Sequence, residues 1–287
     1  MEITIAFLKS SLTIMIPIFF AAAGGVFPAL AGTLNIALEG LLLAGAFSSL
    51  TVFYFSGNVA AAVITAVITA VTLSIIHTFA AFKLRANLFI SGLAVNLFSS
   101  GLCIVLSDKI FKTKGVISAS VSSISKADAL YKNQNLLILF LIIGLILLLI
   151  TWLIIYKTPF GYRLRACDKN SDALFSLGIN PVFYKSIAII ISGFFCGIGG
   201  SFLSLNLGAY VPGMSAGKGW IALAVIFLGA RKPLGILAAA FVFALAESFS
   251  NYAQGFLGIP VDFILAFPYV FTLIAMLGVS IVSKYNK

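Results

Sequence analysis

Two acidic residues in otherwise apolar surroundings are the side chains best placed to do chemistry. Glu39 stands in the run NIALEG and Glu247 in the run FALAES. A charge at the centre of a bilayer costs at least about 2.5–3.5 kcal/mol on insertion scales, so such side chains normally face the interior of a helix bundle. There they either bond to backbone, hydroxyl or amide groups or line a path for a solute. We predict a substrate pathway along Asn35, Glu39, Asn96 and Glu247, with interhelical hydrogen bonding as the alternative role.

The sequence shows no motif for catalysis, for metal binding or for hydrolysis of ATP. Its one His and three Cys offer no spacing that would hold a metal ion. The run GMSAGKG, residues 213–219, has three residues between its first two glycines and a Gly after the Lys. A phosphate-binding loop needs four residues there and a Ser or Thr after the Lys. We therefore expect no catalytic residue, no metal and no cofactor bound by this chain. For the lone His77 we expect a hydrogen bond to a neighbouring helix, with a proton relay as the alternative.

The composition indicates a membrane protein. Of the 287 residues, 61% are hydrophobic and 9% are charged, whereas soluble domains carry about 25% charged residues. The net charge of +10 comes without a basic stripe of interleaved aromatics, so we expect no nucleic-acid partner. Transmembrane β-barrels alternate apolar and polar residues, but the apolar runs here are continuous. Runs without Asp, Glu, Lys or Arg cover residues 10–38, 40–82, 86–107, 133–156 and 186–217.

The fold class that follows is all-α: a polytopic transmembrane helix bundle that forms a single domain over residues 1–287. Since a span needs about 20 apolar residues, we predict about nine membrane segments, within a range of about eight to ten. Glycines and prolines near the end of the first segment and within the seventh favour broken or re-entrant helices there. The predicted segments are Ile5–Phe27, Asn35–Phe55, Val59–Phe82, Leu88–Leu106, Asn135–Tyr156, Ser186–Leu207, Tyr210–Gly229, Leu234–Phe256 and Asp262–Val282.

Lys and Arg are enriched on the cytoplasmic side of membrane proteins, and this rule orients the bundle. One side of the predicted bundle collects all four Arg and most of the Lys residues. We therefore place the C-terminus in the cytoplasm and the N-terminus outside. Lys9, Lys218 and a loop of five lysines over residues 108–134 fall on the outer side. The basic residues assigned to the cytoplasm are Lys83, Arg85, Lys157, Arg163, Arg165, Lys169, Lys185, Arg231, Lys232, Lys284 and Lys287.

One long segment, residues 157–185, is expected on the cytoplasmic face. Pro159 and Gly161 are predicted to end the preceding helix. A short helix over residues 171–177 follows, capped by Asn170 or Ser171, with Gly178 after its last turn. The segment is either an ordinary connector or a docking element for a cytoplasmic partner.

Four blocks of the sequence resemble a known family. They are LNIALEG followed by GAF at residues 34–47, ISGLAVN at 90–96, FGYRLRA at 160–166, and GKGWIALA at 217–224 with Pro233. In this order and spacing they resemble the permease subunits of bacterial ATP-binding-cassette (ABC) importers of the ribose and branched-chain amino acid type. The most similar branch imports nucleosides with a lipoprotein receptor. Two positions depart from the family's pattern, because Asp168 stands where the family usually has Gly and Leu174 where it has Ala.

This resemblance implies a location, a set of partners and a coupling loop. The chain would lie in the bacterial cytoplasmic membrane beside a second permease subunit, and the branch favours a heterodimer. A lipoprotein or periplasmic protein would deliver the substrate, and a cytoplasmic ABC ATPase subunit would hydrolyse ATP. The ATPase would grip the segment 157–185, where the motif positions that match are Gly161, Arg163, Arg165, Ala166, Asn170, Ala173, Gly178 and Ile179.

The branch also implies nucleosides as the substrate class, with riboflavin or simple sugars as alternatives. Two other classes of protein remain open at this stage. A self-sufficient secondary transporter would couple transport to ions through Glu39 and Glu247, and a membrane scaffold would transport nothing. Sensitivity to vanadate together with insensitivity to proton ionophores would separate the importer from the ion-coupled transporter.

Overall fold

The computed structural model describes residues 2–119 and 135–253 of the chain. This part is almost wholly helical, with two short strands and one π-helix. The elements are α1 (Glu2–Leu30), α2 (Leu38–Ser56), α3 (Val59–Thr78), the π-helix η1 (Phe79–Lys83), α4 (Leu88–Phe111), β1 (Ile117–Ser118), α7 (Leu136–Lys157), α8 (Pro159–Lys169), α9 (Ser171–Ser176), α10 (Pro181–Leu207), β2 (Ala209–Tyr210), α11 (Lys218–Leu228) and α12 (Pro233–Ala253).

Seven helices in the described residues are long and apolar enough to cross a membrane: α1, α2, α3 with η1, α4, α7, α10 and α12. Each coincides with one of the predicted segments, so the predicted all-α polytopic transmembrane bundle is confirmed. The seventh predicted segment corresponds to the shorter helix α11. The ninth, Asp262–Val282, and the predicted side of the C-terminus lie outside the described residues.

Short polar side chains and glycines set the ends of these helices. The side-chain oxygens of Asn58, Asn87 and Asn180 accept hydrogen bonds from backbone N–H groups in the first turns of α3, α4 and α10. Such caps satisfy donors that have no partner within the helix. Gly57 after α2 and Gly208 after α10 have φ angles of 68° and 64°, a left-handed conformation that glycine adopts without steric cost.

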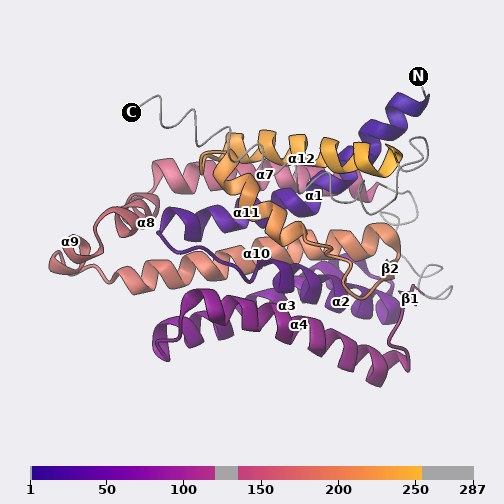
Figure 1. Cartoon of the computed structure of the whole chain (residues 1–287), viewed down its shortest axis with the longest axis horizontal. Coiled ribbons are helices and arrows are strands. Elements are labelled where there is room, and N and C mark those ends of the chain that lie inside the picture. Colours follow the sequence, from indigo (N-terminus) through magenta and orange to yellow (C-terminus); the bar gives the residue numbers. More distant parts are fainter. Residues whose placement is uncertain (1, 120–134, 254–287) are drawn as a thin grey trace.

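The long helices lie roughly side by side, and the bundle has two distinct ends (Figure 1). At one end, α8 and α9 project beyond the bundle. The other end carries β1 and β2, beside α2 and α10, and the strands pair antiparallel through Ile117 with Tyr210 and Ser118 with Ala209. We refer to these as the α8–α9 end and the β1–β2 end.

Helix α10 lies at the centre and approaches its neighbours closely through small residues. A Cβ atom added at Gly197 would lie 2.6 Å from the Cα atom of Val67 on α3, and one at Gly45 of α2 would lie 3.2 Å from the Cα of Gly197. Small interfacial residues allow this backbone approach in membrane bundles. On the outside, by contrast, α7 leaves Ile142 and Leu149 more than half exposed, as a lipid-facing surface requires.

The structure corrects the expectation that the first segment is broken. Helix α1 runs without interruption for 29 residues and contains Pro17 and Pro28. Its paired glycines serve packing instead, since a Cβ atom at Gly24 would lie 2.6 Å from the Cβ of Phe195 on α10. Neighbouring helices can compensate for the backbone hydrogen bonds that proline removes in a membrane helix.

Two other segments are interrupted. Residues 31–37 are not helical, although Thr33, Asn35 and Ala37 are each buried, and α2 begins only at Leu38. The seventh predicted segment begins with β2 and a series of turns, and its helix α11 has 11 residues. That length covers about 16 Å at 1.5 Å per residue, about half of the hydrocarbon layer. Irregular backbone at such depth is tolerated where protein covers it.

The segment 157–185 contains two helices where we predicted one. The preceding helix α7 ends at Lys157, just before Pro159, as predicted. Pro159 is also the first residue of α8, because Thr158 caps this helix and its Oγ1 accepts a hydrogen bond from the Gly161 N–H at 3.3 Å. Proline is favoured at this position, where its missing N–H has no partner to lose. The one helix that was predicted, over residues 171–177, is confirmed as α9 (Ser171–Ser176), and its cap is Asn170.

Candidate functional site

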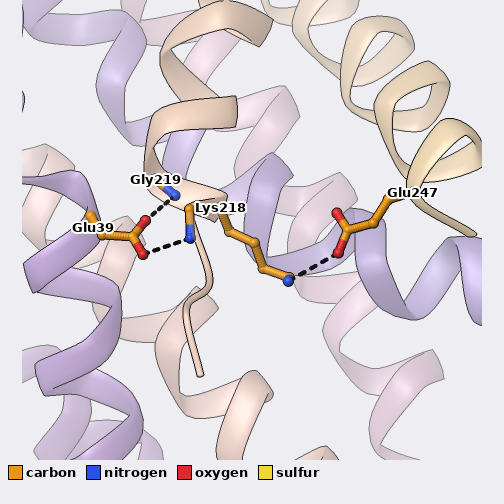
Figure 2. A network of polar contacts seen from close by, with 5 residues as sticks. Glu39, Lys218, Gly219 and Glu247 are labelled. Carbon is orange, nitrogen blue, oxygen red and sulfur yellow. Dashed lines mark hydrogen bonds and ion pairs between the residues drawn. The ribbon is translucent and has the colours of Figure 1, made fainter. Parts of the chain in front are cut away.

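Glu39 binds the beginning of helix α11. Its Oε1 accepts a hydrogen bond from the N–H of Gly217 at 2.9 Å, and its Oε2 accepts one from the N–H of Gly219 at 2.7 Å (Figure 2). These N–H groups lie at a helix N-terminus, where the helix dipole favours a negative charge. The carboxylate therefore joins the start of α2 to the start of α11 through two charge-assisted bonds.

The glycines of the run GMSAGKG make this contact possible. Gly217 has a φ angle of 82°, in the left-handed region. A Cβ atom at Gly219 would lie 2.6 Å from the Cα of Glu39, so only a glycine lets the two backbones approach this closely. The run cradles a carboxylate of the same chain.

Lys218 stands between these glycines and points away from Glu39 toward α12 (Figure 2). Its Nζ lies 3.1 Å from Oε1 of Glu247, and the two side chains are 12% and 19% exposed. The charge count placed Lys218 on the outer side, and the structure places its ammonium group between the helices, in an ion pair. Among the described residues, Oε2 of Glu247 has no hydrogen-bond partner.

Asn35 and Asn96 hold the irregular segment that leads into α2. The side-chain amide of Asn35 donates to Ser192 Oγ on α10 at 2.6 Å, and its Oδ1 accepts from the N–H of Ala37 at 3.0 Å. Asn96 on α4 donates to the carbonyl oxygen of Ile36 at 2.9 Å, and its Oδ1 accepts from the N–H of Gly40 at 2.8 Å. Both amides thus bind backbone and hydroxyl groups on either side of Glu39.

The four candidate pathway residues therefore form one connected series. Asn35 and Asn96 position the start of α2, Glu39 joins α2 to α11, and Lys218 joins α11 to Glu247 on α12. We call these five residues the central polar network. Sequence reasoning missed Lys218 as a member of the network, although the residue stands between two glycines, Gly217 and Gly219.

His77 lies apart from this network. It is fully buried on α3, and a Cβ atom at Gly92 of α4 would lie 3.6 Å from its Cε1. Within the described residues neither ring nitrogen has a hydrogen-bond partner, so the expected bond to a neighbouring helix is not found there.

The predicted coupling-loop residues divide between α8 and α9. On α8, Arg163 donates to the Tyr184 hydroxyl at 2.8 Å. Arg165 lies over the rings of Tyr156 and Tyr162, with 5.3 and 5.0 Å from its Cζ to the ring centroids. Such cation–π contacts orient a guanidinium group. The α8 members of the predicted set are Gly161, Arg163, Arg165 and Ala166.

The other predicted loop residues build the two ends of α9. Asn170 Oδ1 accepts from the N–H of Ala173 at 2.9 Å. At the far end Gly178 has a φ angle of 77°, and the N–H of Ile179 donates to the carbonyl of Leu174 at 3.0 Å. This is the pattern of a glycine-terminated helix, so α9 is a helix of six residues that is fixed at both ends.

Sequence reasoning missed the apolar side chains that α9 presents. Phe175 is 72% exposed and Leu177 is 75% exposed, and both lie at the end where α8 and α9 project from the bundle (Figure 1). Large exposed apolar groups rimmed by polar residues mark interaction surfaces. The run ALFSLG, residues 173–178, was the available sign of these exposed side chains. It contains large apolar residues but is too short to be a membrane span.

Comparison with known proteins agrees with this architecture. Residues 7–280 match the family described as branched-chain amino acid transport system / permease component. The guanosine ABC transporter permease protein NupQ of Bacillus subtilis (strain 168) is 31% identical over 91% of this chain and 88% of its own length. The nucleoside ABC transporter permease protein NupC of Lactococcus lactis subsp. cremoris (strain MG1363) is 30% identical over 93% of this chain and 91% of its own.

A second Bacillus subtilis (strain 168) protein, the guanosine ABC transporter permease protein NupP, is 29% identical over 73% of this chain and 63% of its own length. The family match spans nearly the whole bundle, from within α1 to beyond α12. The chain therefore belongs to the branched-chain amino acid transport system permease family.

Proposed function

We propose that this chain is a permease subunit of an ATP-driven importer for nucleosides, in which a partner subunit hydrolyses the ATP. The observation that carries the proposal is the 30–31% identity, over more than nine-tenths of the chain, to permeases named for guanosine and for nucleosides. The seven long apolar helices of the described part suit a solute path across a bilayer.

The α8–α9 end is the docking site for the ATPase in this proposal, and it faces the cytoplasm together with the C-terminus. Two features support this assignment. Phe175 and Leu177 are exposed apolar side chains on a helix that is fixed at both ends, and such anchors suit a groove on a partner. Lys157, Arg163 and Arg165 lie on α7 and α8 at this end, as expected of a cytoplasmic face.

The opposite, β1–β2 end would receive the solute from a lipoprotein or periplasmic binding protein. A second permease subunit would complete the path. Bacillus subtilis (strain 168) has two proteins named as guanosine ABC transporter permeases, and both are similar to this chain. This pairing favours a heterodimer.

The central polar network would line and shape the solute path. Lys218 and Glu247 keep part of their surface exposed, and Lys218 has donors beyond the one that binds Glu247. They would therefore contact the hydroxyl and amide groups of a nucleoside. Asn35, Asn96 and Glu39 are occupied by backbone and side-chain partners, so they would hold the wall in place.

The test is uptake of labelled guanosine and uridine by cells with and without this gene, with the partner genes intact. We expect gene-dependent uptake that vanadate blocks, that excess unlabelled nucleosides suppress, and that excess ribose leaves unchanged. Gene-dependent uptake of riboflavin or a sugar without nucleoside uptake would contradict the substrate. Uptake that proton ionophores abolish and vanadate leaves intact would contradict the importer itself.

A further inference from the structure

Helix α11 is fastened at both ends. Its N-terminus is held by Glu39 and, through Lys218, by Glu247. Its C-terminus leads into the turn before α12, where Nη1 of Arg231 lies 3.1 Å from Oδ2 of Asp168 in the last turn of α8. The same short helix thus contacts the central polar network at one end and the predicted coupling loop at the other.

Asp168 also contacts the segment that leads to Glu39. A Cβ atom added at Gly32 would lie 2.6 Å from Oδ1 and 3.1 Å from Cα of Asp168. Gly32 begins the irregular stretch that continues through Asn35 into α2. One carboxylate at the end of α8 therefore touches both backbone segments that converge on the polar network.

The connection from Arg231 to Lys218 is stiff. Residues Ala222, Val225 and Ile226 of α11 are buried, and α11 packs against α1, α2 and α12. The turn beyond it is compact, because a Cβ atom at Gly229 would lie 2.6 Å from the carbonyl carbon of Gly235. Arg231 has a φ angle of 55°, and its N–H donates to the carbonyl of Ile226 at 2.9 Å. A rigid element that contacts two sites can carry energetic coupling between them.

We propose that α11 is a coupling strut: the Asp168–Arg231 pair transmits movement of α8 and α9 to the central polar network, and so links ATP turnover to the solute path. The inference rests on the proposed function, in which the ATPase binds the α8–α9 end. Arg231 and Asp168 are 38% and 41% exposed, and ion pairs this exposed add little to folding stability. Loss of the pair should therefore alter coupling far more than stability.

The first experiment uses the assembled importer, with both permeases, the ATPase and the binding protein, in liposomes. It measures the guanosine molecules transported per ATP hydrolysed, and the melting temperature of the complex. D168N and R231Q should each lower the ratio about fivefold, the lower end of the range for coupled sites, with the melting temperature unchanged. The charge-swapped variant D168R/R231D should recover most of the ratio. K232Q, which changes the adjacent cation outside the pair, is the matched control and should behave as wild type.

The second experiment tests whether the two ends of α11 act together. Substitutions separated by more than about 10 Å normally have additive effects, and the 11 residues of α11, which lie between the two ion pairs, span about 16 Å. If both act through the strut, D168N/E247Q should lower the transport ratio no further than the more severe of its two single variants. Additive effects on the ratio would overturn the proposal.

The outcomes separate the strut from the function on which it rests. If the wild-type complex shows no ATP-dependent guanosine uptake, the proposed function is wrong and the strut with it. If the wild-type complex transports guanosine while D168N and R231Q keep its ratio, only the strut is wrong. A third outcome is a transport ratio that falls only together with the melting temperature, without recovery in the charge-swapped variant. That result would show that the Asp168–Arg231 pair is only a structural contact and would overturn the strut.

Discussion

The central polar network and the α8–α9 loop use polar residues in opposite ways. In the network, five side chains join α2, α4, α10, α11 and α12, and most of their polar atoms bind atoms of the chain itself. In the loop, polar side chains cap and orient two short helices, and large apolar groups such as Phe175 remain exposed. Inside the bundle an unpaired polar group costs several kcal/mol by transfer estimates, whereas at the water-exposed end it costs little. Single substitutions in the network should therefore lower the stability of the fold, whereas single substitutions in the loop should weaken its binding to a partner.

The largest effect should follow from Glu39→Ala. The substitution leaves the N–H groups of Gly217 and Gly219 without their acceptors. A fully buried donor costs about 1–3 kcal/mol when its acceptor is lost, and of the two only Gly219 is fully buried. We expect a lower melting temperature of the detergent-solubilised protein and loss of guanosine uptake. Glu39→Gln keeps one acceptor oxygen and should be milder. A wild-type melting temperature for Glu39→Ala would show that the network does not stabilise the fold.

Gly219→Ala should come next, because the added Cβ atom would lie 2.6 Å from the Cα of Glu39. Overpacking of this kind costs about 1–3 kcal/mol, and thermal unfolding in detergent measures it. Gly101→Ala on α4 is the matched control, since no atom lies within 4 Å of its added Cβ atom. Equal melting temperatures for the two variants would contradict the close approach of α2 and α11.

Phe175→Ala tests the loop side of the comparison. The side chain is 72% exposed. Its loss should therefore change the free energy of unfolding by no more than about 0.5 kcal/mol, as for ordinary surface substitutions, and leave the melting temperature nearly unchanged. Loss of a buried interface anchor weakens binding by about 2 kcal/mol, or about thirtyfold. Binding of the purified ATPase to the permease in detergent provides the measurement. Ile64→Ala, an exposed residue of α3, should leave ATPase binding unchanged; the same affinity for both variants would rule out Phe175 as an anchor.

The smallest effect is expected for Asn170→Ala, which removes the cap of α9. Loss of such a cap costs about 1 kcal/mol, and α9 has only six residues. We expect weaker ATPase binding in the same assay, and recovery with Asn170→Asp, which restores the acceptor. No difference between the two substitutions would indicate that the order of α9 does not depend on its cap.

Much of the fold was predictable because a helix that crosses lipid needs about 20 mostly apolar residues, which are easily seen in a sequence. Long runs without charge located seven membrane helices, and glycines with Pro212 marked the interruption before α11. The same residues misled elsewhere. Pro159 starts a helix as readily as it ends one, so α8 was missed, and the glycines of α1 pack against α10 without breaking the helix.

The partners within the site were beyond sequence reasoning. Glu39 was recognised from its apolar surroundings, but its N–H donors lie 178 and 180 residues away along the chain. Counting charges along the chain could not show that Lys218 pairs with Glu247, 29 residues away. Only the packing of α11 against α2 and α12 brings the two carboxylates to their partners on α11. No local sequence pattern predicts that packing.

The shortness of α11 bears on how the protein enters its membrane during synthesis. A helix of 11 residues that begins with a lysine is too short to leave the translocon as an independent span, although the rest of it is apolar. The ammonium group of Lys218 meets its carboxylate only after Glu247, 29 residues later, has been synthesised. Helices α11 and α12 should therefore integrate as one unit, and in ribosome-bound chains that end before residue 247, α11 should still crosslink to the translocon, although the earlier spans are already in the membrane.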